Sequence, residues 1–394
     1  MNSNFDIPNW DWQITPRYSA AFQFSEGLAS IKELGTDDKG EETYTFIDDN
    51  GTVILHGDGA AHKFSDGLAK CARSDNEVGY IDMKGETVIP FEYFRHSGDF
   101  SHGLVNLYVK HEDGFRVGYM KSNGRWLIRP SFYNGSPFSD GFALVHLVKA
   151  SASIYKWMHK TWIDTGGKKI TSSVLMGSSF YNGLASATPK TLAGWGYVDT
   201  NGKWSVKPQF SFASDFSHGI ALVGVSRNKD EVISNKNKYW LIDATGQKVS
   251  NLINLKKHPH GTLQINQESV FVGGESYSRG YRTFEIPSQL FSRQGKLILQ
   301  DTPEWTMVSV LGSLIWVKTL GEEQPQRYGL IDRNGKFVIP PTFSQIGQPG
   351  SNGLISVAVP VWSDEEVWNE DESKYCPRGW VDIYGYGKPI AGLA

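Results

Sequence analysis

Two phrases decide the fold of this chain: Phe64-Ser65-Asp66-Gly67-Leu68-Ala69 and, after a short gap, Gly79-Tyr80-Ile81-Asp82-Met83-Lys84-Gly85. Close variants of both phrases return in alternation along most of the 394 residues. Self-similarity at a period of about 20 to 50 residues is the mark of an array of similar structural units. We therefore predict a repeat protein whose units pack against their neighbours in sequence.

The first phrase, Phe-Ser-x-Gly, has clear copies and weaker echoes. The clear copies are residues 24–27, 64–67, 100–103, 138–141, 180–183 and 216–219, and the weaker echoes are 277–280 and 351–354. The second phrase ends at a turn glycine, found at Gly51, Gly85, Gly124, Gly167, Gly202, Gly246, Gly295, Gly335 and Gly385. These glycines follow one another at a mean step of about 42 residues, which lies in the range of known arrays.

Each unit is predicted to consist of β-strands. After the first phrase apolar residues alternate with others, as at Val105, Leu107 and Val109, which indicates a strand with one buried face. The second phrase is typical of a strand ending in a tight turn, followed by a strand that a proline closes at a sheet edge. We count roughly three short strands in each unit of about 36–50 residues. The prediction is an all-β fold of short antiparallel hairpins or three-stranded units, stacked into a curved array that is either β-propeller-like or an open β-solenoid.

The repeated polar residues are interpreted as turn chemistry. Seven of the nine turns carry an aspartate, at Asp48, Asp82, Asp164, Asp199, Asp243, Asp332 and Asp382. Such an aspartate can bond the turn amides, while the glycine takes a positive φ. The serine of the first phrase is expected to bond nearby backbone. Calcium needs six or more converging oxygens, which one carboxylate per hairpin does not supply, so no metal or other cofactor is predicted.

The two ends of the chain both lie inside a unit. Residues 13–18 resemble the closing strand at 88–93, and residues 379–385 resemble the second phrase. The ends either complete one unit together or cap an open array, and the sequence leaves both open. Residues 1–394 are predicted to be a single array, with clear repeats over 20–250, degenerate repeats over 251–327 and a return of the pattern over 328–394.

Composition bounds the possible partners and location. The formal net charge is −3 and no Lys/Arg stripe appears, so nucleic acid is not an expected partner. No run of eighteen apolar residues and no signal-peptide pattern is present, so we expect no membrane association and a cytoplasmic location. The two cysteines fit that location. Cys71 is interpreted as a small core residue and Cys376 as an exposed thiol in a polar connection.

The units resemble the bacterial WG repeats, also called KWG repeats. The resemblance is carried by residues 64–69 with 79–90, 180–185 with 196–208, and 328–341, and it runs over nearly the whole chain. It implies tandem β units with binding roles. It also implies association with polymorphic-toxin loci, where such proteins can act as immunity partners. It brings no catalytic residues.

The connection before the second phrase varies most in length, and long loops on a rigid scaffold are where binding residues usually lie. Residues 151–160 contain Tyr155 and Trp157, and residues 361–378 form the largest connection. We predict partner-binding residues at Tyr155, Trp157, Trp362, Glu365, Glu366, Trp368, Asp371 and Glu372. Aromatic residues would anchor a protein partner, and the carboxylates would steer a basic one.

No motif of a known enzyme is present. The pair His258 and His260 has a spacing found in metal sites, but no third ligand lies nearby. There is no Walker phrase, no nucleophile elbow and no zinc-protease motif. The leading prediction is a non-catalytic protein-binding module, most concretely an immunity protein that neutralises a toxin. A glycan-binding module that uses its aromatic residues is the first alternative, and an enzyme with a site between repeats is the second.

Overall fold

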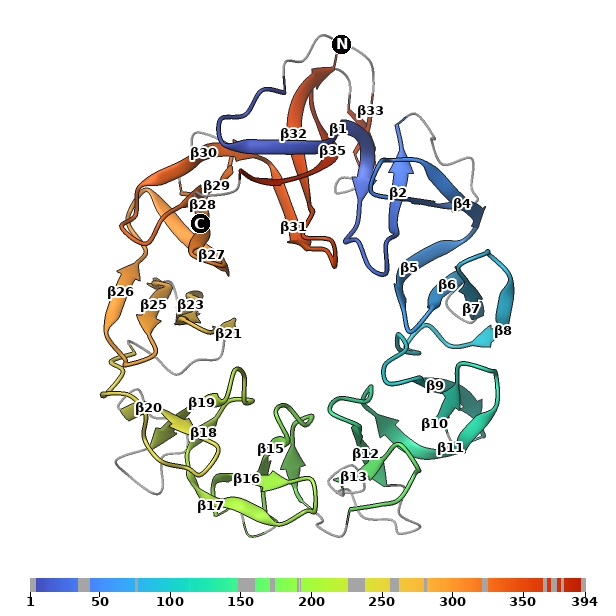
Figure 1. The fold of residues 1–394 in the computed structure, drawn as a ribbon, viewed down its shortest axis with the longest axis vertical. Helices are drawn as coiled ribbons and strands as arrows, with labels where there is room; N and C mark the ends of the chain where they lie inside the picture. The colour runs from blue at the N-terminus through green and yellow to red at the C-terminus, as the bar shows by residue number, and fades with distance from the viewer. Residues whose placement is uncertain are drawn as a thin grey trace. The chain divides into compact units, whose positions relative to one another are not determined.

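Strands form all the regular structure of the described chain. The computed structural model describes residues 5–34, 43–74, 77–112, 114–147, 160–170, 174–189, 191, 193–225, 238–255, 262–279, 282–320, 325–363, 367–369, 374–376 and 379–390. Within these ranges there are thirty-five strands and no helix (Figure 1). The all-β prediction is therefore confirmed. No helix in the described part of the chain is both long and apolar enough to span a bilayer.

One sheet shows the plan of the repeat. It consists of β5 (Ala60–Ser65), β6 (Leu68–Ser74), β7 (Glu77–Asp82) and β8 (Thr87–Tyr93), paired antiparallel in chain order. The first phrase forms the β5–β6 turn, and the second phrase forms the β7–β8 turn. Both turns lie at one end of the sheet, so the β6–β7 connection leaves from the opposite end. The structure thus adds a short fourth strand, just before the Phe-Ser phrase, to the three predicted from the sequence.

The chain divides into two compact units, residues 96–302 and residues 1–95 with 303–394. In the unit of residues 96–302, a five-stranded sheet contains β9 (Leu104–His111), β10 (Gly114–Lys121), β11 (Trp126–Gly135), β12 (Phe142–Leu147) and β13 (Lys160–Asp164). Its further sheets contain β14 (Met176–Gly177), β15 (Leu184–Thr188), β16 (Trp195–Asp199) and β17 (Trp204–Phe210), then β18 (Phe212–Ala213), β19 (Ile220–Val225) and β20 (Lys238–Asp243), then β21 (Leu263–Ile265), β22 (Ser269–Val272), β25 (Gln289–Ser292) and β26 (Leu297–Gln300). A separate hairpin, β23 (Glu275–Arg279) with β24 (Arg282–Ile286), interrupts the last of these sheets between β22 and β25.

In the other unit, two four-stranded sheets follow the plan, β5 to β8 and the set β27 (Trp305–Leu311), β28 (Leu314–Thr319), β29 (Tyr328–Ile331) and β30 (Phe337–Phe343). A seven-stranded sheet has the order β31-β32-β35-β1-β2-β3-β4. Its strands are β31 (Gln345–Pro349), β32 (Ile355–Ser363), β35 (Gly379–Pro389), β1 (Trp10–Ala21), β2 (Ala29–Glu33), β3 (Thr43–Ile47) and β4 (Val53–Asp58). A hairpin of β33 (Val367–Asn369) and β34 (Lys374–Cys376) interrupts it between β32 and β35.

The first strand joins the two ends of the chain in this sheet. Its first half pairs with β35, with Trp10 opposite Pro389 and Ile14 opposite Tyr386, and its second half pairs with β2, with Ala21 opposite Ile31. The register shifts between these halves around Pro16, where proline cannot donate to the ladder. Of the two arrangements that the sequence left open, the two ends complete one unit together rather than forming two separate caps.

The structure corrects the assignment of the last turn. Gly385 lies inside the continuous strand β35 and has no positive φ, whereas the other eight predicted turn glycines do. A Cβ atom on Gly385 would lie 2.6 Å from the oxygen of Ile14, the same close packing that a Cβ on Gly196 would meet against Val206. The equivalent of the second phrase therefore begins at Gly385-Tyr386, and Asp382 lies in the strand rather than in a turn. The prediction failed because glycine serves two purposes in this repeat.

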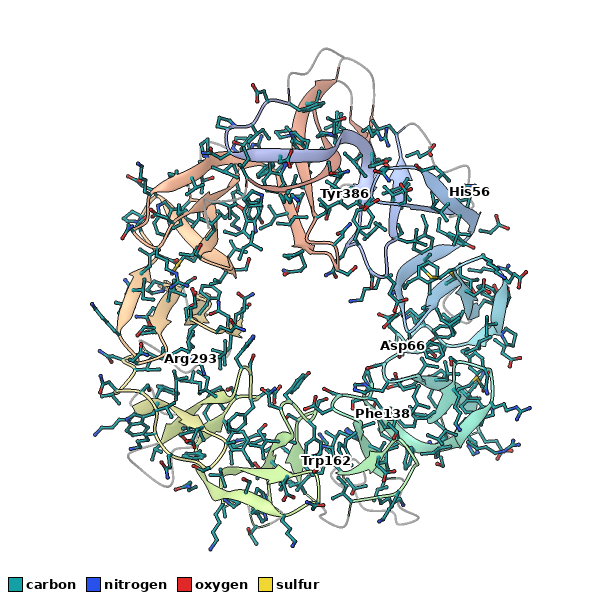
Figure 2. The ribbon with its side chains drawn as sticks, in the orientation of Figure 1. His56, Asp66, Phe138, Trp162, Arg293 and Tyr386 are labelled. Carbon is teal, nitrogen blue, oxygen red and sulfur yellow. The ribbon has the colours of Figure 1, made fainter. Side chains whose placement is uncertain are left out.

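The hydrophobic core lies between successive sheets. Leu144 and Trp162 of one sheet, for example, form a cluster with Phe180 and Val198 of the following sheet. Trp162 is fully buried (labelled in Figure 2). Burying a large apolar side chain stabilises a fold by roughly 1.5–3 kcal/mol, so these two sheets stabilise each other through this cluster.

Candidate binding surface

The end of each sheet that carries the Phe-Ser-x-Gly turn is fixed by backbone geometry. In the first copy, Ser25 and Leu28 exchange both backbone hydrogen bonds, at 2.9 and 3.1 Å. Glu26 and Gly27 between them have φ values of 53° and 86°, as a two-residue type I′ hairpin requires. The other residues at the Glu26 position also have a positive φ, and they are Asp66, His102, Asp140, Asn182 and His218.

The serine of this phrase does more than the sequence predicted. Its hydroxyl donates to a backbone oxygen of the following repeat instead of to nearby backbone. The four bonds are Ser25 to Phe64 at 2.7 Å, Ser101 to Phe138 at 2.8 Å, Ser139 to Phe180 at 2.7 Å and Ser217 to Ile265 at 2.9 Å. Because each bond spans about one repeat, these serines hold adjacent repeats in register.

Two of the turn carboxylates make a parallel set of bonds. An oxygen of Glu26 accepts from the backbone nitrogen of Gly67 at 2.9 Å, and an oxygen of Asp140 accepts from that of Gly183 at 2.9 Å. Asn182 accepts from Gly219 in the same way at 3.4 Å. The side chains that point from these turns are therefore bound to the neighbouring turn, which explains them structurally.

The aspartates of the second phrase behave as the sequence predicted in six of the seven turns. Oδ1 of Asp48 accepts from the backbone nitrogens of Asn50 at 2.9 Å and Thr52 at 2.8 Å. Asp82, Asp164, Asp199, Asp243 and Asp332 repeat this pair of bonds. The backbone hydrogen bond from Thr52 lowers the pKa of Asp48, and a side-chain bond from Thr245 lowers that of Asp243. The described ranges contain no group of three or more His, Cys, Asp or Glu side chains able to hold a metal ion.

The opposite end of each sheet carries the variable connections. Between β6 and β7 only residues 75–76 intervene, whereas residues 148–159 lie between β12 and β13 and residues 226–237 between β19 and β20. Two of these connections are expanded into β-hairpins. We call them the β23–β24 arm (residues 275–286) and the β33–β34 arm (residues 364–378).

The β33–β34 arm lies in the connection that the sequence singled out. Trp362 belongs to β32, where it is the register partner of Trp380, and Trp368 belongs to β33 opposite Tyr375. The predicted residues Tyr155, Trp157, Glu365, Glu366, Asp371 and Glu372 lie outside the described residues, as do His258 and His260. Cys376, predicted to lie in a polar connection, is in strand β34.

The β23–β24 arm was not predicted from the sequence, because part of its sequence resembles the first repeated phrase. Residues 277–280 resemble Phe-Ser-x-Gly, yet Tyr277 and Arg279 pair with Phe284 and Arg282 in the arm. The turn that takes the place of the phrase in this sheet joins Asn266 to Ser269, with the Asn266 amide oxygen accepting from the Ser269 nitrogen at 2.7 Å. An Asx turn at the expected distance before Gly295 is the signal that could have revealed it.

Cys71 has the structural role predicted for it. The side chain is fully buried among apolar residues of two sheets. This burial raises the pKa of its thiol to about 12, so the reactive thiolate is scarce at neutral pH.

These observations define a class of protein: an all-β repeat scaffold with fixed turns at one end of each sheet and variable connections at the other. The sequence profile of the WG-containing repeat matches residues 12–36, 79–105, 118–146, 195–226 and 328–359. The chain therefore contains WG repeats at these five places. A scaffold of this kind suggests a protein-interaction module at most.

Solved structures with a similar fold share little sequence with this chain. A crystal structure described as the eukaryotic initiation factor has 9% identity and a TM-score of 0.54, covering 82% of this chain and 87% of that one. BamB from Moraxella catarrhalis has 9% identity and a TM-score of 0.31, covering 94% and 83%, and Sqt1 from Saccharomyces cerevisiae has 9% identity and a TM-score of 0.37, covering 84% and 98%. The first of these likenesses concerns the fold alone. No curated protein matches the sequence.

Proposed function

We propose that this protein is a non-catalytic scaffold that binds a protein partner through the variable ends of its sheets. The observation that carries the proposal is the contrast between the two ends. The residues of the turns form hydrogen bonds within their own repeat and to the next one, while two connections at the other end contain β-hairpin arms. Specificity in a repeat scaffold resides in the positions that differ between repeats.

The β33–β34 arm is the proposed contact region. Its sequence contains Trp368 and a run of acidic residues, and Trp362 lies just before it in β32. Aromatic side chains supply most of the energy of protein interfaces, and exposed carboxylates raise the association rate with a basic partner. These residue types therefore favour a basic protein partner over a sugar or a membrane.

The more specific form of the proposal is an immunity protein that neutralises a bacterial toxin. It rests on the WG repeats and on the acidic arm, because a scaffold that blocks a toxin needs only to cover its surface. Co-expression with each toxin domain encoded beside the gene is expected to rescue growth in one case. If no such toxin is neutralised, the immunity form is rejected while the binding role stands.

The register of β32 and β35 offers a sharp test of the arm. Ser363 and Gly379 are paired directly, so residues 364–378 can be replaced by Asn-Gly, which forms a two-residue type I′ turn between partnered residues. A matched control shortens the other arm, with Asn-Gly replacing residues 276–285 between the partners Glu275 and Ile286.

Both variants are expected to keep the melting temperature of the natural protein. In affinity capture from the native host, the variant without residues 364–378 should lose the partner that the natural chain retains, and the control should keep it. Equal capture by all three proteins would contradict the assignment of this arm.

A further inference from the structure

A pair of basic side chains lies at the variable end of the β12–β13 ladder. His146 of β12 and Lys160 of β13 are direct register partners, next to the connection of residues 148–159. Directly opposed residues of an antiparallel pair project from the same face with their Cβ atoms about 5 Å apart. The two basic groups are therefore neighbours.

This pair borders an apolar cluster. Leu144 and Trp162, the register partners two residues further along the ladder, lie on the same face and are buried with Val174. His146 and Lys160 are each only partly exposed. Such an environment weakens the hydration of a charge and strengthens its interaction with an opposite charge.

The pair has no carboxylate of its own in the described part of the chain. Burial, and to a smaller extent the charge of Lys160, together lower the pKa of His146 to about 4. Burial also lowers the pKa of Lys160. The surrounding sequence is also basic. Residues 142–162 contain Lys149, Lys156 and His159 but no Asp or Glu.

We propose that His146 and Lys160 form a receptor for a carboxylate side chain on an acidic protein segment. Both groups can donate a hydrogen bond to one carboxylate, and the apolar border favours the resulting ion pair over separate hydrated ions. The inference rests on the proposed binding role only for the protein origin of the carboxylate. It adds a basic site, which would bind an acidic segment, to a protein whose β33–β34 arm is acidic.

Binding at this site is linked to proton uptake. A bound carboxylate stabilises the imidazolium, so the pKa of His146 in the complex is higher than in the free protein. A group that gains protons on binding makes the affinity rise as the pH falls. The increase occurs below the pKa of the complex and levels off below the free pKa of about 4, where the ligand carboxylate is itself being protonated.

Histidine NMR titration of the full chain tests the proposal, with the His146 signal assigned by its loss in His146→Gln. The probes are acetate and tetraglutamate, and each is expected to raise the pKa of His146 by roughly one pH unit. Lys160→Gln should weaken tetraglutamate binding about tenfold, whereas Lys168→Gln, an exposed lysine in the turn at the other end of the same ladder, should leave it unchanged.

Three results would overturn the assignment. The first is a His146 titration that neither probe alters, and the second is equal tetraglutamate binding by the two lysine variants. The third is a response to oligothymidylate without a response to tetraglutamate, which would indicate a phosphate site. Because the probes are small molecules, these results do not depend on whether the proposed partner of the β33–β34 arm exists.

Discussion

Glycine has two distinct physical roles in this repeat, and each role leaves its own mark. At Gly183 the backbone has a φ of 75° and open space around it, so the residue is needed for its conformation. At Gly196 the φ is ordinary, but a Cβ atom would lie 2.5 Å from the oxygen of Val206 and 2.7 Å from the nitrogen of Pro208. The second glycine permits one strand to approach the bulge of the next, and the proline needs no hydrogen bond there.

Alanine substitutions should separate these roles. Gly196→Ala is expected to lower the free energy of unfolding by about 1–3 kcal/mol, because neighbouring backbone must move. Gly183→Ala should cost about 1–2 kcal/mol through the left-handed conformation alone. Urea denaturation measures both values. Replacing Gly183 by Asn, which tolerates a positive φ, should recover most of the loss, while Gly196→Asn should be worse than Gly196→Ala.

The turn aspartates give the fold an acid-sensitive element. Hydrogen bonds lower the pKa of Asp48, Asp243 and Asp332 in the folded chain. A lowered folded pKa means that the stabilisation is complete above the unfolded value of about 4 and is lost as the pH falls through the folded value. Asparagine keeps an acceptor oxygen without titrating, so the triple Asp→Asn variant should lose less thermal stability than the natural chain between about pH 5 and pH 2.5. Parallel losses in the two proteins would show that these turns do not titrate on unfolding.

At the scale of the sheet, the repeated phrases could be predicted because each needs particular residues. The hairpin requires a glycine with a positive φ and in most copies also has an aspartate that bonds the turn amides, and this chemistry located eight of the nine predicted turns. The error at Gly385 arose because the glycine of close packing is indistinguishable in sequence from the glycine of a turn. The arms could not be predicted, because they occur in single units and leave no periodic signal. The same holds for His146 and Lys160, which become neighbours only through the register of β12 and β13.

The β33–β34 arm gives a prediction about association kinetics. Replacing Glu365, Glu366, Asp371 and Glu372 by glutamine or asparagine should slow association with a basic partner at least tenfold at low salt, with a smaller change in dissociation. Stopped-flow mixing at two ionic strengths measures this effect. The difference between natural and neutral chains should shrink as salt screens the charges. Association rates that match at low salt would remove the steering role of these carboxylates.

At the scale of the molecule, one contact shows that the ends of the chain meet as successive repeats do. Tyr119 and Tyr197 each donate a hydroxyl hydrogen bond to a serine oxygen at the start of the following repeat, at 2.9 and 2.8 Å. Tyr386 makes the equivalent bond at 2.8 Å to the oxygen of Phe22, 364 residues away in sequence (Tyr386 is labelled in Figure 2). The junction between β35 and β1 is thus built with the same contact as the junctions between neighbouring repeats.

This junction should control the stability of the unit formed by residues 1–95 and 303–394. Deleting residues 1–13 removes the three β1–β35 pairs at Trp10, Asp11 and Trp12 and takes Ile7 and Trp10 out of the cluster around Trp316 and Phe343. The loss of two buried apolar side chains alone is expected to cost about 3–6 kcal/mol, measured by urea denaturation.

A circular permutant separates the effect of losing the β1–β35 pairing from the effect of changing the position of the chain ends. Ile390 donates a backbone hydrogen bond to Asn9 at 3.0 Å, so a few glycines can join residue 390 to residue 5. New ends placed within the connection of residues 226–237 leave every described strand intact. The free energy of unfolding of the permutant should be close to that of the natural chain, because β1 and β35 stay paired. A truncated chain as stable as the natural one, or a permutant as unstable as the truncation, would show that the β1–β35 pairing does not hold the two ends together.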